Sequence, residues 1–258
     1  MKVIIPMTGQ GSRFIKAGYT TYKALIEMHG KPIIEYVASL FPTETNFIFI
    51  CRNDMLQDSE LNLEATLLNI IPTANIVGIN EHKLGPVYTV AQIFDLIEDE
   101  EPVVCNYCDF FMNWDYTDFK QKILNHQYAG AIPCYTGFHP HLLHLNNLYA
   151  GCQVDSNMNL KEIKEKFSFE ADKSLGYHSA GTYYFDKGKY VKKYFQQLMD
   201  EQITLNGEYY ISLVYNLMLK DKMDILVYDK IPHFCQLGTP EDMMEYNNWS
   251  NIFEAYSK

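Results

Sequence analysis

Short apolar runs alternate with helically spaced apolar positions over the first half of the chain. Runs of strand length cover residues 3–7, 46–51, 74–79 and 103–107. A helix is expected to begin near Pro32, because a proline in the first turn loses no hydrogen bond. Helical spacing also covers residues 56–71 and 85–97. Strands that alternate with helices predict an α/β fold with a doubly wound, mostly parallel sheet of the Rossmann-like kind.

The pattern changes after about residue 130. Short strands are predicted at residues 150–154, 160–163 and 181–185, and helices at residues 187–199, 208–219 and 241–253. This mixture indicates a small α+β lobe on the same sheet. No internal repeat or linker interrupts the chain, so we expect a single domain over residues 1–258 with two functional halves, about 1–130 and about 131–258.

Composition and charge narrow the classes of partner. The chain has 258 residues and is 47% hydrophobic, which is enough to bury a full core. Its net charge of −11 argues against nucleic acid, because phosphate backbones require a basic surface. No apolar run approaches about 18 residues, so no membrane span is expected, and the N-terminal run is too short for a secretory signal.

The six cysteines show no disulfide framework, so we expect a reducing compartment and a cytoplasmic location. Cys105 and Cys108 form a C-x-x-C, but no second pair stands at zinc-type spacing. His139, His141 and His144 lie in a proline-containing segment without the spacing of a zinc site. The ordinary interpretation of both groups is structural.

A glycine-containing loop follows the first predicted strand. Gly9 and Gly11 have no side chain, so backbone N–H groups there can approach the oxygens of a phosphate group. A Gly-x-Gly loop alone is weak evidence, because such loops also make ordinary tight turns. Arg13 and Lys23 add positive charge nearby, and the combination indicates a phosphate-binding site.

The spacing of these residues resembles the N-terminal signature of the sugar nucleotidyltransferase family, typified by glucose-1-phosphate thymidylyltransferases. That signature has Gly-x-Gly-x-Arg, a lysine ten residues later and Gly-Lys-Pro seven residues after the lysine, and the chain has Gly9, Gly11, Arg13, Lys23 and Gly30-Lys31-Pro32 at those positions. It departs from the family at Lys16 and Tyr22, which replace prolines. The segments 80–90, 149–166 and 237–241 resemble later parts of the family's sequence.

The resemblance implies a role for each site residue. Arg13 and Lys23 would be catalytic, and Asp109 would bind the metal ion. The nucleotide would contact Gly9, Gln10, Gly11, Ser12, Asn80, Gly85 and Pro86, and the acceptor would contact Gly151, Glu165, Lys166 and Gly181. Pro86 stands where the family usually has threonine. Gln236 stands where the family has a second metal-binding aspartate, and Asp229 or Asp242 could replace that ligand.

The implied reaction joins a nucleoside triphosphate to a sugar 1-phosphate or a similar phosphorylated small molecule and releases pyrophosphate. The resemblance further implies Mg²⁺ as the cofactor, a pyrimidine nucleotide (CTP, UTP or dTTP) and a role in surface polysaccharide precursor synthesis; a homo-oligomer is left open. One alternative is a glycosyltransferase, but its Asp-x-Asp motif is absent at residues 106–109. Another is a non-catalytic nucleotide-sugar-binding regulatory protein, which the presence of Arg13 and Lys23 disfavours.

Overall fold

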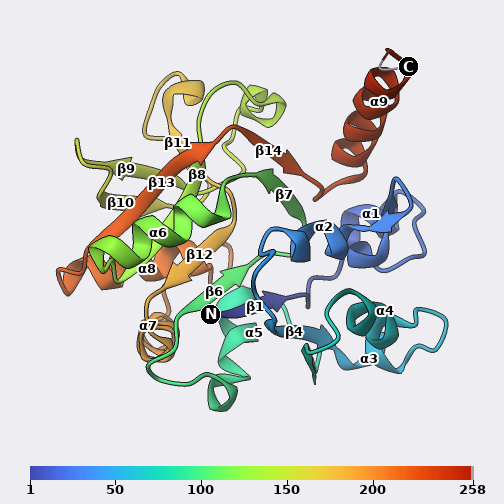
Figure 1. Ribbon diagram of the computed structural model, residues 1–258, viewed down its shortest axis with the longest axis horizontal. Helices are drawn as coiled ribbons and strands as arrows, with labels where there is room; N and C mark the ends of the chain where they lie inside the picture. The colour runs from blue at the N-terminus through green and yellow to red at the C-terminus, as the bar shows by residue number, and fades with distance from the viewer. Residues whose placement is uncertain (257–258) are drawn as a thin grey trace.

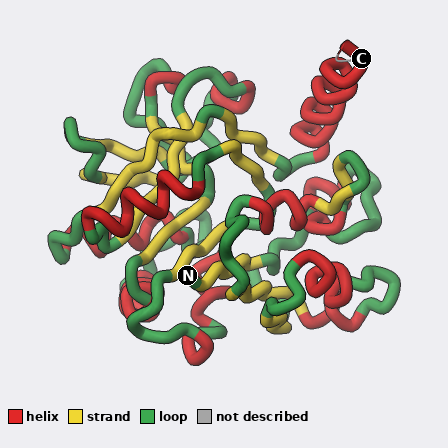
Figure 2. The backbone as a smooth tube through the Cα atoms, in the orientation of Figure 1, coloured by secondary structure: helices red, strands yellow, loops and turns green. Residues whose placement is uncertain are grey.

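The computed structural model describes residues 1–256 and shows a ten-stranded sheet with helices against it (Figure 1). In Figure 2 most of the yellow strands run through the middle of the molecule, and red helices lie around them. The two large clusters of buried apolar side chains lie on opposite faces of this sheet. The α/β fold that the sequence pattern predicts is therefore confirmed.

The first half of the chain forms four parallel strands that are joined through helices. The strands are β1 (Lys2–Pro6), β4 (Asn46–Arg52), β5 (Asn75–Ile79) and β6 (Val103–Asn106), all at the predicted places. β1 pairs with β4 on one side and β6 on the other, and β5 extends the sheet beyond β4. The helices are α1 (Ser12–Lys16), α2 (Ile33–Ser39), α3 (Asn53–Gln57), α4 (Leu63–Ile70) and α5 (Pro86–Ala91), and a short hairpin pairs β2 (Glu27–Met28) with β3 (Lys31–Pro32).

Two helices of this half are shorter than their apolar spacing predicts. The helix predicted over residues 56–71 is divided into α3 and α4, because the Asp58 side chain accepts a hydrogen bond from the Glu60 backbone and Asn62 adopts a φ of 47°. The helix predicted over residues 85–97 ends at Ala91 and continues as a 3₁₀ turn, Phe94–Leu96. Backbone bonds three residues apart, such as Ile93 to Val90, tighten the chain there.

The second half contains both expected and unexpected elements. The strands β9 (Gly151–Val154), β10 (Leu160–Lys164) and β12 (Thr182–Phe185) and the helices α7 (Gly188–Asp200), α8 (Ile211–Lys220) and α9 (Pro240–Tyr256) were predicted. The sequence pattern missed β8 (Gly130–Tyr135), β11 (Tyr177–Ser179), β13 (Ile225–Ile231) and β14 (His233–Gln236). It also missed β7 (Phe110–Asn113) and α6 (Tyr116–His126), which precede the second half. β8 contains Pro133, and a proline inside an apolar run argues against a central strand.

The large sheet is mixed. Its order is β10-β9-β11-β8-β12-β6-β1-β4-β5, and β13 pairs with β8 outside that path. β12 pairs antiparallel with both β6 and β8 and so joins the parallel first half to the strands of the second half. The antiparallel strands therefore extend the same sheet, as expected for a small α+β lobe built on it.

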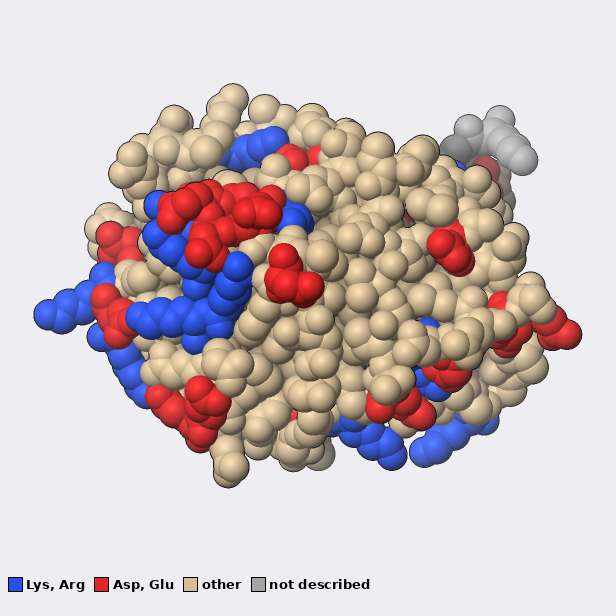
Figure 3. Space-filling model, turned by 90° about the horizontal axis from the view of Figure 1, so that it is seen from below, with Lys and Arg blue, Asp and Glu red and all other residues tan. Residues whose placement is uncertain are grey.

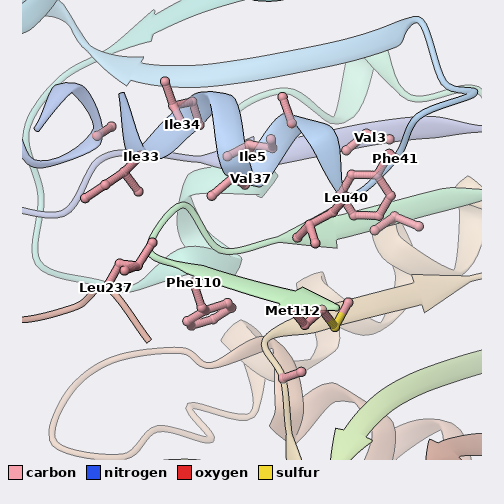
Figure 4. Packing of buried hydrophobic residues seen from close by; sticks show 14 of the residues in the cluster. Val3, Ile5, Ile33, Ile34, Val37, Leu40, Phe41, Phe110, Met112 and Leu237 are labelled. Atoms are coloured by element: carbon pink, nitrogen blue, oxygen red, sulfur yellow. The ribbon is translucent and has the colours of Figure 1, made fainter. Parts of the chain in front are cut away.

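Alternating side chains of β1 fill the two faces of the sheet. Val3 and Ile5 belong to one buried cluster, and Ile4 belongs to the other. In Figure 4, Ile33 and Val37 of α2 lie beside Ile5. Burying one such aliphatic side chain contributes about 1.5–3 kcal/mol to stability, so this packing stabilises the position of α2 against the sheet.

The surface charges are mixed rather than uniformly basic. On the face shown in Figure 3, blue side chains lie among red ones. Lys187, Lys189 and Lys192 form ion pairs with Glu100 or Asp99. Over residues 1–256, no helix is long and apolar enough to span a lipid bilayer.

Candidate active site

A cavity with a volume of about 460 Å³ opens where β1 and β6 end. The carboxyl ends of parallel strands are the usual ligand-binding edge of an open α/β sheet. The lining consists of Pro6, Thr8, Gly9, Gln10, Gly11, Ser12, Lys23, His82, Lys83, Gly85, Pro86, Tyr107, Cys108, Asp109, Glu208 and Tyr210. The structure thus brings together residues from five separate parts of the chain.

The glycine loop forms one rim of this cavity, as predicted. Gly11 has a φ of 61°, a left-handed conformation that favours glycine, and it leads directly into α1. A side chain at Gly9 would meet nothing within 4 Å, so this part of the rim is open. The Gln10 side chain donates a hydrogen bond of 2.6 Å to Glu81, which ties the loop to the segment after β5.

An ion pair lies inside the cavity. The Lys23 Nζ is 2.5 Å from Oδ2 of Asp109, and the two side chains are 17% and 27% exposed. Burial acts to lower the pKa of Lys23, but the Asp109 carboxylate outweighs it and the pKa is raised, so the ammonium stays charged. The structure therefore holds a fixed positive charge beside the glycine loop, as an anion-binding site requires.

Arg13 lies on α1 and is exposed, outside the lining of the cavity. Its positive charge acts to lower the pKa of Lys23, Tyr149 and Asp242, so it lies within electrostatic range of the ion pair. Lys83 lines the cavity from the opposite rim and was not singled out from the sequence. The cavity thus has basic side chains from three segments around it.

Two carboxylates approach each other beside Gly238. A Cβ built on Gly238 would lie 3.4 Å from Oδ2 of Asp109 and 3.9 Å from Oδ2 of Asp242. Gln236, at the position of the family's second aspartate, donates from Nε2 to Oδ1 of Asp242, and its amide oxygen accepts from the Tyr149 hydroxyl. β14 brings this segment there by pairing antiparallel with β7, which follows Asp109.

This donor set fits a hard divalent cation. Mg²⁺ takes one or two carboxylates from a protein and keeps other positions for water and phosphate oxygens. Asp242 is therefore the candidate for the second ligand because it shares the surroundings of Gly238 with Asp109, although it does not line the cavity itself. Asp229 lies on β13 and is not among the groups beside Gly238. Within residues 1–256, no group of three or more His, Cys, Asp or Glu side chains could hold a metal ion. Nucleotide phosphates would have to supply the remaining ligands.

We expect Gln236→Asp to strengthen metal binding by about tenfold, or about 1.4 kcal/mol. The new carboxylate would stand beside Asp242, whose pKa is already raised by burial, and a cation would relieve the repulsion between the two. Calorimetric titration of Mg²⁺ in the presence of a non-hydrolysable triphosphate measures this change. Gln236→Asn, which shortens the side chain equally without adding charge, is the matched control. Overlapping titrations of wild type and Gln236→Asp would contradict the assignment.

The opposite wall is built on Gly85. Its φ is 87°, and a Cβ there would lie 2.9 Å from both the backbone N and O of Tyr209. The backbone N–H of Tyr209 donates to Leu84, and the N–H of Val87 donates to Tyr209. This close approach is possible only for glycine and brings Glu208 and Tyr210 into the lining. Sequence reasoning missed these two residues because their segment lies more than 120 positions away from Gly85.

Asn80 does not line the cavity, in contrast to its implied role. Its amide oxygen accepts a 3.0 Å hydrogen bond from Asn53, and its side chain is exposed. His82 lies two residues later and lines the wall instead. The part of this segment that lines the cavity therefore lies within residues 82–86, and Asn80 lies outside it.

His82 organises this wall. The backbone N–H of Leu84 donates to Nδ1 of His82 at 3.1 Å, so Nδ1 is an acceptor and the ring proton is on Nε2. Nε2 lies 3.0 Å from Oγ1 of Thr89, which is 2.8 Å from Oγ1 of Thr8 at the end of β1. The neutral imidazole therefore connects the segment before Gly85 to the strand that carries the glycine loop.

We expect nucleotide binding to weaken below about pH 6.5, the ordinary pKa of histidine. Burial lowers the pKa of His82, so the folded protein binds fewer protons there than the unfolded chain does. The hydrogen bonds that His82 makes in this wall are therefore complete above about pH 6.5, the pKa of histidine in the unfolded chain. They are lost as the pH falls through the lower pKa that His82 has in the folded protein. In His82→Asn the amide oxygen can still accept from Leu84 but does not titrate. The KM for triphosphate should rise at low pH more in wild type than in His82→Asn; identical pH profiles would contradict the role of His82.

The four implied acceptor residues do not line this cavity. Gly151 is closed over by the Phe167 carbonyl, 2.3 Å from a built Cβ, and Gly181 by the Phe110 ring at 1.7 Å. Glu165 accepts a 2.6 Å hydrogen bond from Ser212, and burial raises its pKa. Lys166 donates to the Tyr210 hydroxyl at 3.1 Å. Lys166 thus contacts the cavity wall through Tyr210, whereas Glu165 bonds to the buried Ser212 outside the lining and the two glycines allow close packing.

The hydroxyl of Tyr107 is buried at this edge and makes no hydrogen bond within residues 1–256. The Ile211 backbone lies near this hydroxyl and acts to lower the pKa of Tyr107, but the two groups do not have the geometry of a hydrogen bond. Other atoms of Tyr107 line the cavity, whereas its hydroxyl is closed off from it.

The C-x-x-C pair and the three histidines of residues 139–144 form no group of metal-binding side chains among the described residues. Cys105 is buried in β6 and Cys108 is a free thiol beside Asp109. Nε2 of His141 lies 2.6 Å from the Tyr135 hydroxyl, and burial lowers the pKa of His141 to about 2. His139 lies beside it, with 2.5 Å between the two Nδ1 atoms.

Solved structures share this fold. The chain is similar to a nucleoside-diphosphate-sugar pyrophosphorylase from Vibrio cholerae RC9, with 21% identity, a TM-score of 0.76 and coverage of 95% of this chain and 99% of that one. It is also similar to a UDP-glucose pyrophosphorylase complexed with UDP-glucose, with 18% identity, a TM-score of 0.73 and coverage of 97% and 98%. The inositol-1-phosphate CTP transferase from T. maritima matches at 15% identity and a TM-score of 0.68, with coverage of 93% and 90%.

No model of a known protein family matches the chain, and no curated protein matches it. The shared architecture over nearly the whole length nevertheless confirms the nucleotidyltransferase fold that the sequence resemblance implied. At these identities the similarity establishes the fold, and the chemistry must be argued from the site.

Proposed function

We propose that this protein is a nucleotidyltransferase that joins a nucleoside triphosphate to a phosphorylated small molecule and releases pyrophosphate. The observation that carries this proposal is the Lys23–Asp109 ion pair inside a cavity rimmed by the glycine loop. A charged lysine and a carboxylate at this edge of the sheet suit a reaction between two anions. The enzymes with the same fold handle nucleotides and phosphorylated acceptors, which supports the proposal.

The bond changes of this reaction need no general base. An oxygen of the acceptor phosphate forms a bond to the α-phosphorus, the bond from that phosphorus to the bridging oxygen breaks, and pyrophosphate leaves with the electron pair. A phosphate monoester is mostly ionised at neutral pH because its second pKa is about 6. The task of the protein is therefore to position two anions and to offset their charge. Lys23 and Arg13 are proposed to do this at the α-phosphate.

Mg²⁺ is the proposed cofactor, and Asp109 and Asp242 would hold it. When bound, it would neutralise phosphate charge and orient the triphosphate. The residues of the glycine loop, 9–12, are proposed to hold the phosphates through their backbone. His82, Gly85 and Pro86 are proposed to bound the space for the base, with a pyrimidine triphosphate (CTP, UTP or dTTP) as the substrate.

The acceptor is proposed to be a sugar 1-phosphate or a similar phosphorylated small molecule. Glu165 and Lys166 remain candidates for acceptor binding because Lys166 contacts Tyr210 in the cavity wall. The product would be an activated precursor for a surface polysaccharide. The cysteines over residues 1–256 are free thiols, which suits the proposed cytoplasmic location.

A release assay tests this function. Purified protein with Mg²⁺ is incubated with CTP, UTP, dTTP, ATP and GTP, each with and without a panel of acceptor phosphates, and pyrophosphate is measured. Acceptor-dependent pyrophosphate release is expected. A glycosyltransferase would instead consume nucleotide sugars, and a regulatory protein would bind them without turnover.

A further inference from the structure

A second concave surface lies between β14 and α9, outside the nucleotide cavity. This groove has a volume of about 770 Å³, and residues 138–140, β14 and one face of α9 line it. The buried residues of α9 are Pro240 and Met243, both near its start, and the rest of the helix projects from the body (Figure 1). The volume lies within the range of small-molecule sites, about 300–1,000 Å³.

Aromatic rings line both sides of this groove. Phe234 is buried at its base, whereas Phe138 is 72% exposed on one side and Trp249 is 51% exposed on the other. Tyr246 lies on the same face of α9, one turn before Trp249. The faces of aromatic rings attract apolar groups and also organic cations, with Trp the most effective.

The charged groups of the groove are acidic. Asp242, Glu245 and Glu254 belong to the lining, which contains no Lys or Arg. His139 also lines it, but burial lowers the pKa of His139, so it is neutral at neutral pH. Asp242 and Glu254 stand about 18 Å apart along the helix, so the carboxylates are spread along the groove and do not converge on one metal ion.

A second copy of this chain does not suit the groove. α9 carries Glu241, Asp242, Glu245 and Glu254 and no Lys or Arg over residues 240–256. Two such helices packed together would bring like charges into contact, which disfavours association. Asp242 already accepts from the Gln236 amide and Glu254 lies 3.8 Å from Nδ1 of His29, so Glu245 is the carboxylate of the lining that a ligand would meet. A ligand with apolar carbon around a positive nitrogen suits both the rings and this carboxylate.

The groove adjoins the nucleotide cavity. Asp242 and Gln236 line the groove, Asp109 lines the cavity, and a Cβ built on Gly238 would lie 3.4 Å from Oδ2 of Asp109 and 3.9 Å from Oδ2 of Asp242. An acceptor whose phosphate lies near Lys23 could therefore extend past Gly238 into the groove. The glycines that were implied to receive the acceptor, Gly151 and Gly181, are closed over by Phe167 and Phe110.

We propose that the groove binds a positively charged nitrogen of the acceptor, which is then a phosphorylated amine such as an amino alcohol phosphate. This proposal rests on the proposed function and narrows its acceptor. The phosphate end lies toward Lys23 and Asp109, and the ammonium end lies among Phe138, Tyr246 and Trp249.

A binding experiment without turnover tests the groove itself. The chain has two tryptophans, so the indole N–H signals of Trp249 and Trp114 can be followed by NMR during titration with tetramethylammonium chloride. Trp114 donates to the Leu40 carbonyl at 3.0 Å, far from the groove lining, and serves as the internal reference. The Trp249 signal should move and the Trp114 signal should not, and tert-butanol should bind about tenfold more weakly.

Matched acceptors test the link to the reaction. 2-Aminoethyl phosphate and propyl phosphate have the same length and differ in the charged nitrogen. The KM for 2-aminoethyl phosphate should be about tenfold lower, and Trp249→Ala and Glu245→Gln should raise it about tenfold without changing the KM for triphosphate. Met244→Ala is the control, because Met244 is 66% exposed on α9 and outside the groove lining.

The outcomes separate this proposal from the proposed function. Turnover of neutral acceptors with no shift of Trp249 overturns the groove site and leaves the function standing. Tetramethylammonium binding without pyrophosphate release from any pair overturns the function and, with it, the acceptor role. If Lys166→Met raises the KM for 2-aminoethyl phosphate and the groove variants do not, the nitrogen binds elsewhere. A change from dimer to monomer in Trp249→Ala would show that the groove is a subunit interface and would also overturn the proposal.

Discussion

Lys23→Met should lower kcat about 100-fold, equivalent to about 3 kcal/mol of lost transition-state stabilisation. The Lys23 ammonium is fixed by Asp109 at 2.5 Å beside the glycine loop, so it needs no rearrangement when charge grows on the α-phosphate. Methionine keeps the apolar stem and removes only the charge. Because this interaction strengthens in the transition state, the KM for triphosphate should change less than kcat. Steady-state kinetics with the best triphosphate and acceptor measure both constants.

Lys16→Met is the matched control for Lys23→Met, because Lys16 is exposed on α1 and does not line the cavity. Arg13→Ala should lower kcat in the same direction, since the Arg13 charge acts on Lys23 and Asp242. The variants must keep the circular dichroism spectrum of the wild type, because removing Lys23 leaves a half-buried Asp109 without its partner. A folded Lys23→Met variant with near-normal kcat would refute the catalytic role of Lys23.

Asp109→Asn should raise the Mg²⁺ concentration for half-maximal activity by at least about tenfold. An amide oxygen is a weaker ligand for a hard cation than a carboxylate, and Asp109 is one of the two carboxylates that flank Gly238. Asp242→Asn should act in the same direction if Asp242 replaces the missing aspartate at position 236. Binding of Mn²⁺ by electron paramagnetic resonance, with a non-hydrolysable triphosphate present, measures the metal affinity without turnover.

Glu241→Gln is the matched control for the metal variants, because it removes an exposed carboxylate next to Asp242 in the first turn of α9. Its Mn²⁺ affinity should equal that of the wild type. The wild-type protein should bind Mn²⁺ weakly without nucleotide, since two carboxylates offer few ligands. Full activity in excess chelator, or unchanged Mn²⁺ affinity in Asp109→Asn, would rule out the proposed metal site.

Hydrophobic patterning predicts the strands that are buried in the parallel part of the sheet. β1, β4 and β6 lie where the apolar runs are, because strands covered by helices on both faces must be apolar at nearly every position. β5 lies at the edge of the sheet and is only partly buried, but it too follows an apolar run. The pattern failed for β8 and β14. β8 contains Pro133, and the short segment 233–236 becomes a strand only because β7 offers it a partner.

The candidate site likewise has one part that the sequence predicts and another that it does not. The spacing of Gly9, Gly11, Arg13 and Lys23 could be read from the sequence, because these residues follow one strand and lie close together along the chain. Asp109 could be placed because it follows a buried strand, where ligands usually bind. The positions of these residues depend on their neighbours along the chain, so the sequence alone can indicate them.

The other residues that line the cavity were brought there by tertiary structure. Glu208 and Tyr210 reach the cavity only because Tyr209 pairs with Leu84 and Val87 through the backbone, and no periodicity encodes that pairing. The closing of Gly151 and Gly181 by Phe167 and Phe110 is likewise a long-range contact. The sequence by itself therefore determined the strand-and-loop unit that carries Arg13 and Lys23. Only the folded chain decided which distant segments complete its walls, because contacts between distant segments depend on how the whole sheet is assembled.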